Sequence, residues 1–351
     1  WTTPETHDII RANLHRAPLY SGKIHGVGPR YCPSIEDKIV KFADKERHQV
    51  FLEPEGAKSR EWYVQGMSTS LPEDVQWQMY RSVPGLRRAE LTRLAYAIEY
   101  DCIDSRQLRP TLESLHVKGL FFAGQINGTS GYEEAACQGL LAGMNAALQL
   151  QGKQPLVITR DMAYIGVLTD DLTTKGTDEP YRMMTSRSEY RLLHRQDNAD
   201  QRLTHIGAAV GLVPQERLKQ VEEKYEMVAK EIARLEGKGV PGSKELNEML
   251  AKRESTPVEN SARLADLLRR PQVTYEDIAP FDLTRPELPA AVTQEVEIQV
   301  KYAGYLARQE KQVAEFKKEE SRRLPEGIDY NAITGLRLEA RQKLSEIRPM
   351  S

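Results

Sequence analysis

The pattern of apolar and polar positions changes near residue 155 of this 351-residue chain. Before that point, short runs rich in β-branched and aromatic residues alternate with Gly and Pro, which favours strands separated by turns. These runs lie at 48–52, 62–64 and 119–123. After it, charged segments with a helical apolar period predict helices at 218–236, 261–269 and 294–323. The pattern therefore predicts an α/β part followed by an all-α part.

A glycine-rich loop follows the third apolar run and leads into a predicted helix. Its residues that could contact a cofactor are Gly124, Gln125, Asn127, Gly128 and Gly131. A loop of this kind presents backbone N–H groups and a helix N-terminus to an anion or to the edge of a flavin. Tight helix-on-sheet packing without a ligand is the alternative. The Gly-x-Gly-x-x-Gly fingerprint of dinucleotide-binding folds does not follow any strand-like run.

The helix after this loop has two notable features. Ser130 and Glu133 have the spacing of a capping box, which predicts that the helix begins near Ser130. Ala135, Gly139 and Gly143 recur every four residues and predict a flat face. Glycine inside a helix costs about 1 kcal/mol relative to alanine. Close packing of this face against a sheet or a flat ligand would offset that cost.

Cys32 lies in a turn between two prolines, just ahead of a short predicted helix that Ser34 can cap. Arg30 and the helix dipole both favour its thiolate form. A purely structural role is the alternative. Cys102 has acidic neighbours and Cys137 lies among small helical residues, so neither is expected to react. Three cysteines this scattered predict neither a disulfide framework nor a metal site.

Three segments, 26–38, 122–134 and 179–192, together resemble one family. The chain is similar, over nearly its whole length, to the MnmG (GidA) family of tRNA uridine 5-carboxymethylaminomethyl modification enzymes. The resemblance implies a partial FAD-binding domain of the glutathione-reductase (Rossmann-like) type and a helical C-terminal domain. Residues 1–26 would end an inserted NADH-binding domain, 27–155 would form the C-terminal part of the FAD-binding domain, and 156–351 would bind tRNA and partners. We expect the chain to be the later part of such a protein, without the N-terminal FAD half.

The resemblance also assigns residues. Cys32 matches the catalytic cysteine of the family. The stretch 28–42, which includes Gly28, Pro29, Arg30 and Tyr31, matches a nucleotide-binding segment. In the glycine-rich loop, Gln125 matches an FAD-contacting position.

The chemistry that the resemblance implies is addition of a carboxymethylaminomethyl or aminomethyl group at C5 of a wobble uridine in tRNA. Methylenetetrahydrofolate would supply the one-carbon unit, FAD the redox step and NADH the electrons. The GTPase MnmE would be the partner of a cytoplasmic homodimer. C5 of uracil is a poor nucleophile, and a thiolate added at C6 would activate it. A general acid/base role for the cysteine is equally compatible with the sequence.

Arginines recur in the segment that follows residue 181. Arg187, Arg191 and Arg195 are spaced for one face of a helix, with Arg182 close before them. Guanidinium groups suit bidentate contact with phosphate, so this face is predicted to bind tRNA. Internal pairing with acidic neighbours is the alternative. Those neighbours are Glu189, Asp197 and Asp200.

Composition narrows the function classes. The chain has 49 Lys+Arg and 51 Asp+Glu, so binding of nucleic acid would depend on a local basic cluster rather than on net charge. No apolar run is long enough for a membrane span, so no membrane role is expected. Two other functions stay open: a folate- and FAD-dependent tRNA uridine methyltransferase, and a non-catalytic module that docks tRNA or a GTPase.

Overall fold

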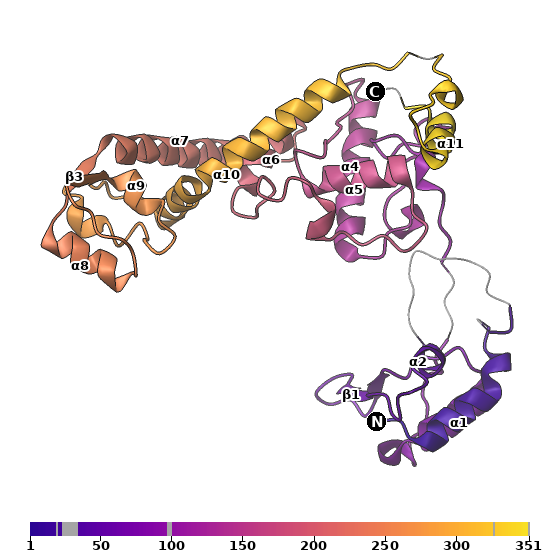
Figure 1. The fold of residues 1–351 in the computed structure, drawn as a ribbon. Coiled ribbons are helices and arrows are strands. Elements are labelled where there is room, and N and C mark those ends of the chain that lie inside the picture. Colours follow the sequence, from indigo (N-terminus) through magenta and orange to yellow (C-terminus); the bar gives the residue numbers. More distant parts are fainter. Residues whose placement is uncertain (19, 23–33, 97–99, 326, 350–351) are drawn as a thin grey trace. The chain divides into compact units, whose positions relative to one another are not determined.

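The computed structural model describes residues 1–18, 20–22, 34–96, 100–325 and 327–349 (Figure 1). Within it the chain forms two compact units. Unit 1 comprises Trp1–Val157 and Val167–Met184, and unit 2 comprises Ile158–Gly166 and Thr185–Ser351. None of the described helices is both long and apolar enough to span a bilayer.

The first part of unit 1 packs three helices around an apolar core. They are α1 (Pro4–Asn13), α2 (Ile35–Lys41) and α3 (Glu73–Arg81). Ser34 caps α2 through a reciprocal capping box with Asp37, which confirms its predicted role. The core side chains are almost completely buried: Ile10, Ile35, Ile39, Met67, Leu71, Val75 and Met79.

An antiparallel hairpin adjoins these helices. Strand β1 (Phe51–Pro54) pairs with β2 (Trp62–Gln65), so strands form at the first two predicted runs, with the first displaced by about half its length. Phe51 and Trp62 are about half exposed on this two-stranded sheet.

The third predicted strand, 119–123, does not form. Only Phe121 makes a β-bridge, with Glu113, and Leu120 is 42% exposed. An extended run becomes a strand only where a neighbouring backbone supplies a ladder of hydrogen bonds. Among the described residues the pairing stops after two backbone bonds, from Ser114 N–H to Leu120 and from Phe122 N–H to Leu112, so only one bridge forms.

Helix α4 (Tyr132–Leu150) follows the glycine-rich loop. Its N-cap is Gly131 without a side-chain cap, so the predicted capping box at Ser130 is wrong. The Ser130 hydroxyl instead donates to the carbonyl oxygen of Tyr181 at 3.2 Å. Ala135 lies against Gly124, but nothing described lies within 4 Å of the face at Gly139 and Gly143.

Unit 2 is helical, as predicted. The predicted helix 218–236 is α7 (Gln215–Gly237), and 294–323 is α10 (Ala290–Glu320). The predicted helix 261–269 divides: β4 (Ser261–Arg263) pairs with β3 (Gly239–Pro241), and only α9 (Leu264–Leu268) is helical. The other helices are α5 (Tyr164–Asp170, which spans the boundary between the units), α6 (Ala199–Ala209), α8 (Lys244–Lys252) and α11 (Leu338–Ile347).

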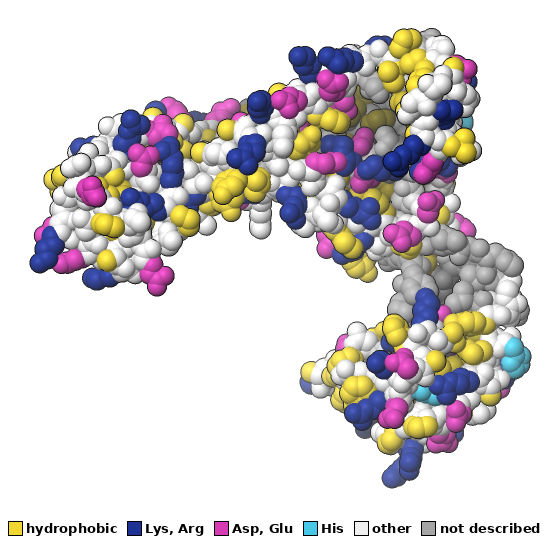
Figure 2. All heavy atoms as spheres, in the orientation of Figure 1, with side chains coloured by type: hydrophobic (Ala, Val, Ile, Leu, Met, Phe, Trp, Pro, Cys, Tyr) yellow, Lys and Arg dark blue, Asp and Glu magenta, His cyan; other side chains and the backbone are white. Residues whose placement is uncertain are grey.

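The core of unit 2 lies where α7, α9 and α10 meet. On α10, Val296 and Val300 are buried there, whereas Tyr305, further along the same helix, is 60% exposed. On the other side of the core, Leu235, Leu264 and Leu268 are completely buried. On the face that Figure 2 shows, basic and acidic side chains are intermixed over α7 and α10.

Candidate functional site

The glycine-rich loop of unit 1 has a backbone that requires glycine at two positions. Gly124 and Gly128 have φ of +87° and +85°. Between them, Gln125–Asn127 form one 3₁₀ turn. A Cβ atom at Gly128 would collide with the hydroxyl of Thr177. At Gly131 a Cβ would collide with the carboxylate of Glu134 and the guanidinium of Arg182, so glycine here allows the loop to pack closely at the start of α4.

A buried amide holds this loop on α4. Gln138, completely buried, accepts hydrogen bonds from Gly124 N–H at 3.2 Å and from the side-chain amide of Asn127 at 2.8 Å. Its own amide group donates to Thr129 Oγ1 at 2.9 Å and to the carbonyl oxygen of Glu134 at 3.1 Å. All four hydrogen-bonding positions of this side chain are therefore used, three of them to hold the loop and one to bond α4 itself.

A second segment of unit 1 is joined to the loop. Tyr181 N–H donates to the carbonyl oxygen of Gly128, and Ser130 N–H donates to that of Tyr181, each at 2.9 Å. The Tyr181 hydroxyl donates to Asp171 at 2.8 Å. Residues 128–130 and 181 therefore run side by side, with a parallel bridge between Thr129 and Tyr181.

Arg182 belongs to this loop rather than to an arginine face. Its guanidinium lies 3.4 Å from Glu133 and 3.6 Å from Glu134, both on the first turn of α4. Glu134 is 3% exposed and also accepts a 2.7 Å hydrogen bond from Met183 N–H. The buried carboxylate is thus compensated by one cation and one backbone donor.

One buried polar atom of the loop has no hydrogen-bond partner among the described residues. Asn127 is completely buried, and its Oδ1 accepts no hydrogen bond from the described residues. A buried, unpaired acceptor costs about 1–3 kcal/mol, and a donor on a bound molecule would remove that cost. The loop thus combines a fixed glycine-rich backbone, a helix N-terminus without a side-chain cap and one unused acceptor, an arrangement suited to a planar or anionic cofactor.

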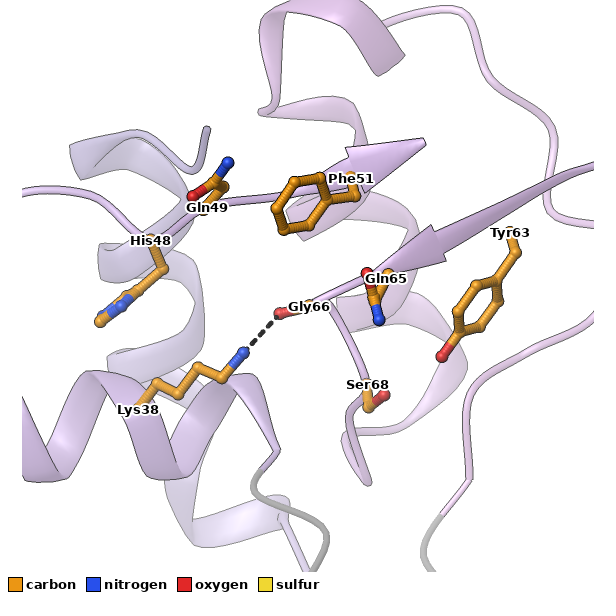
Figure 3. Close-up of a pocket in the computed structure, with 8 residues that line it drawn as sticks. All are labelled: Lys38, His48, Gln49, Phe51, Tyr63, Gln65, Gly66 and Ser68. Carbon is orange, nitrogen blue, oxygen red and sulfur yellow. Dashed lines mark hydrogen bonds between the residues drawn. The ribbon is translucent and has the colours of Figure 1, made fainter. Parts of the chain in front are cut away.

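A shallow pocket lies in the first part of unit 1 (Figure 3). It measures about 570 Å³ and is lined by Lys38 of α2, His48, and Phe51 and Tyr63 of the hairpin. Lys38 Nζ donates to the carbonyl oxygen of Gly66 at 3.3 Å. Burial, and then the charge of Lys38, lower the pKa of His48, so at neutral pH Lys38 is the cation of this pocket.

The cysteine segment lies outside the described residues. This applies to Cys32 and to the predicted nucleotide contacts Gly28, Pro29, Arg30 and Tyr31. Cys137 is half-buried on α4 against Leu168, Leu172 and Tyr181, and burial raises the pKa of its thiol, in keeping with a packing role. In the part of the chain that the structure describes, no three His, Cys, Asp or Glu side chains are grouped to hold a metal.

The helix that the arginine spacing predicted does not form. Residues 182–198 contain turns and one short 3₁₀ segment but no α-helix. In unit 2, Arg195 pairs with Asp197 at 2.9 Å and its side chain is 13% exposed, over the ring of Tyr302. Arg191 is exposed, with no ion pair to any residue that the structure describes. For Arg195 this geometry favours internal pairing, and for Arg191 it leaves the guanidinium available to solvent.

The sequence prediction missed Gln138 and Glu134. Both lie on the buried side of α4, at i and i+4, between small residues. Two polar residues four positions apart share one face of a helix, and this spacing was the only indication in the sequence that they belong to the site. The pattern alone did not show that the preceding loop folds back onto this side.

Comparison with known proteins gives one consistent result. The family model described as Glucose inhibited division protein A matches residues 1–154. The tRNA modifying enzyme MnmG/GidA C-terminal helical domain matches 215–310, and the corresponding C-terminal helical bundle matches 312–351. These matches confirm the predicted fold class, an α/β part followed by a helical part.

Relatives and solved structures agree with these matches. The tRNA uridine 5-carboxymethylaminomethyl modification enzymes MnmG of Caldicellulosiruptor saccharolyticus and Lachnoclostridium phytofermentans are 58% and 57% identical over the whole chain. The chain spans 56% of the length of each. Two crystal forms of Aquifex aeolicus GidA match 99% of the chain with TM-scores of 0.72 and 0.70, at 48% and 51% identity. The chain covers 54% and 55% of those structures.

Proposed function

Because the chain belongs to the MnmG/GidA family of tRNA-modifying enzymes, we propose that it supplies part of the active site and the tRNA-binding surface of an enzyme that modifies C5 of wobble uridine. The observation that carries this proposal is the Gly124–Gly131 loop, fixed by Gln138 at the start of α4. We propose a cytoplasmic homodimer, with methylenetetrahydrofolate and NADH as co-substrates and the GTPase MnmE as partner.

The loop fits FAD. The glycines allow the loop to pack closely against α4 and the segment at Thr177. Gly131 leaves the start of α4 without a side-chain cap, and Asn127 Oδ1 offers an unused acceptor for a ring or ribityl donor. When bound, FAD would supply the redox step. Gln125 contributes a neutral amide, which orients a ligand by hydrogen bonding without adding charge. Lys38, in the predicted nucleotide-binding stretch, offers a cation for a phosphate of a second nucleotide.

Cys32 would act on the uracil ring. As a nucleophile, its thiolate forms a bond to C6, and the electron pair of the C5–C6 double bond moves toward O4, which gives C5 the character of an enolate. After substitution at C5, loss of the C5 proton to a base restores the double bond and expels the thiolate. As an acid/base group, the same side chain would exchange only that proton.

The helical domain is proposed to bind tRNA through exposed arginines. We expect Arg191→Ala to weaken binding across tRNAs of different sequence. It should also lower the slope of log affinity against log salt concentration by about 0.7 to 0.9, the value for one lost phosphate contact. Filter binding of the purified chain at several salt concentrations measures this slope.

Arg195→Ala is the matched comparison. It removes a mostly buried guanidinium that pairs with Asp197 and donates to the carbonyl oxygen of Leu192. Its melting temperature should therefore fall, with a loss of about 1–3 kcal/mol of stability. At a temperature where both variants are folded, its salt slope should stay near that of the parent chain. An unchanged slope in Arg191→Ala would refute the phosphate contact.

The two other functions are less well supported. If the chain were part of a folate- and FAD-dependent methyltransferase, the matches of residues 215–310 and 312–351 to MnmG/GidA helical domains would be unexplained. A non-catalytic docking module does not account for a glycine loop that three hydrogen bonds to one buried side chain hold in place and that keeps an unused buried acceptor among the described residues.

A further inference from the structure

A second pocket of unit 1 lies away from the glycine-rich loop. It measures about 430 Å³ and lies between residues 109–121 and the C-terminal half of α4. Its lining includes Asn145 and Gln149, which follow Tyr132 by 13 and 17 residues along α4. At a rise of 1.5 Å per residue, these positions are roughly 20–25 Å from the loop. None of the predicted cofactor residues lines this pocket.

The walls of the pocket are fixed by hydrogen bonds. Ser114 Oγ accepts from His116 N–H and Val117 N–H at 3.1 and 3.2 Å, which holds the turn above it. Asn145 is 2% exposed and exchanges hydrogen bonds of 2.7 and 2.9 Å with the backbone of Leu156. The lining is therefore organised before any ligand arrives.

One hydroxyl of this lining has no hydrogen-bond partner in the described part of the chain. Thr111 is 7% exposed, lines the pocket, and its Oγ1 makes no hydrogen bond with any residue that the structure describes. The neighbouring backbone groups are already paired: Arg109 N–H donates to Glu113, and Phe122 N–H donates to Leu112. A buried hydroxyl without a partner costs free energy, and a ligand oxygen at the floor of the pocket would recover it.

The charge around this hydroxyl favours an anion. Arg109, Lys118 and Lys153 line the pocket together with His116, and Glu113 is the single acidic residue. Glu113 is held by Gly119 N–H and by the amide of Gln149, both at 2.8 Å. These two hydrogen bonds, and then the charges of Arg109 and Lys118, lower the pKa of Glu113. The carboxylate is therefore ionised, and the two cations partly offset its negative charge. The remaining formal charge of the lining is about +2 with His116 neutral.

We propose that this pocket binds a phosphate group of a small nucleotide, with Thr111 as the buried donor and Lys118 and Lys153 as the cations. Phe121 and Leu115 give the lining an apolar side for a base. The volume lies in the range of sites for small molecules. The phosphates of a folded RNA lie on its outer surface and cannot reach a hydroxyl that is more than nine-tenths buried, so the geometry favours a small ligand over tRNA.

Calorimetric titration of the 351-residue chain with ADP, inorganic phosphate and adenosine tests the proposal. We expect saturable binding of ADP with Kd below about 1 mM, and no binding of adenosine. Thr111→Val keeps the volume but removes the donor, and it should weaken ADP binding about tenfold, the value of one hydrogen bond to a charged group. Lys118→Ala with Lys153→Ala should weaken it at least as much and reduce its salt dependence.

Lys58→Ala is the matched control, because Lys58 is an exposed lysine of unit 1 outside this pocket. It should leave ADP binding unchanged. Thr111→Val removes an unpaired hydroxyl, so its melting temperature should not fall. ADP binding that is unaffected by Thr111→Val would overturn the proposal. The proposal would also be overturned if inorganic phosphate bound as tightly as ADP. The same holds if the lysine variants weakened tRNA binding but left ADP binding unchanged. All of these outcomes are independent of the function proposed for the glycine-rich loop.

Discussion

Replacing Cys32 with serine is expected to reduce uridine modification by at least about 100-fold, because a hydroxyl is a far weaker nucleophile and acid/base group than a thiol at neutral pH. The protein to test is a chimera in which this chain replaces the matching 56% of the Caldicellulosiruptor saccharolyticus relative. Mass spectrometry of nucleosides from treated tRNA gives the extent of modification. Flavin absorption of the variant should match that of the unsubstituted chimera.

Cys102→Ser is the control for this prediction. Cys102 is exposed, and its replacement removes a thiol without removing the proposed catalytic group. It should retain full modification activity. If Cys32→Ser were as active as Cys102→Ser, the catalytic assignment would be wrong.

Replacing Gln138 with leucine is expected to lower the free energy of unfolding of unit 1 by about 2–4 kcal/mol. The change leaves Gly124 N–H and the Asn127 amide without their shared acceptor in a buried site. Thr129 loses its bond to the Gln138 amide as well. Thermal unfolding of the chain, compared with hydrogen exchange at the Gly124 amide, measures both the stability and the local opening of the loop.

Gln151→Leu is the matched change, since Gln151 is exposed at the end of α4 and its side chain makes no hydrogen bond with any residue that the structure describes. Its effect on stability should stay within about 0.5 kcal/mol. In the chimera, Gln138→Leu should also weaken flavin binding while Gln151→Leu does not. Equal melting temperatures and equal flavin affinity for the two variants would show that Gln138 does not hold the loop.

Helices with strong periodicity were predictable from the sequence. The segments that became α7 and α10 carry a regular apolar stripe over many turns, and local pattern decides such elements. Capping of α2 by Ser34 was predictable for the same reason, because a capping box uses only residues three apart.

The elements that the sequence predicted wrongly depend on more than the local apolar pattern. Residues 119–123 have the composition of a strand, but a strand needs a neighbouring ladder, which one sequence segment cannot specify. Arg187, Arg191 and Arg195 have helical spacing, but the segment folds as turns in which Arg195 binds Asp197, two residues away. Local side-chain hydrogen bonds of this kind compete with a helix.

The sequence predicted the glycine-rich loop of the candidate site but not the hydrogen bonds that hold it in place. Glycines at 124, 128 and 131 indicated a tight backbone before α4, and the positive φ values at Gly124 and Gly128 agree with that. The partners that fix the loop are Gln138 on α4 and Tyr181 from a later segment. Their role depends on tertiary folding, so motif spacing did not reveal it.

The chimera with this chain unsubstituted tests the central proposal most directly. It should be produced in cells that lack their own member of the MnmG/GidA family, and nucleosides from their tRNA should be examined by mass spectrometry. We expect a carboxymethylaminomethyl or aminomethyl group at C5 of the wobble uridine, at a level close to that restored by the intact relative. A folded, flavin-containing chimera that leaves this uridine unmodified would contradict the proposal.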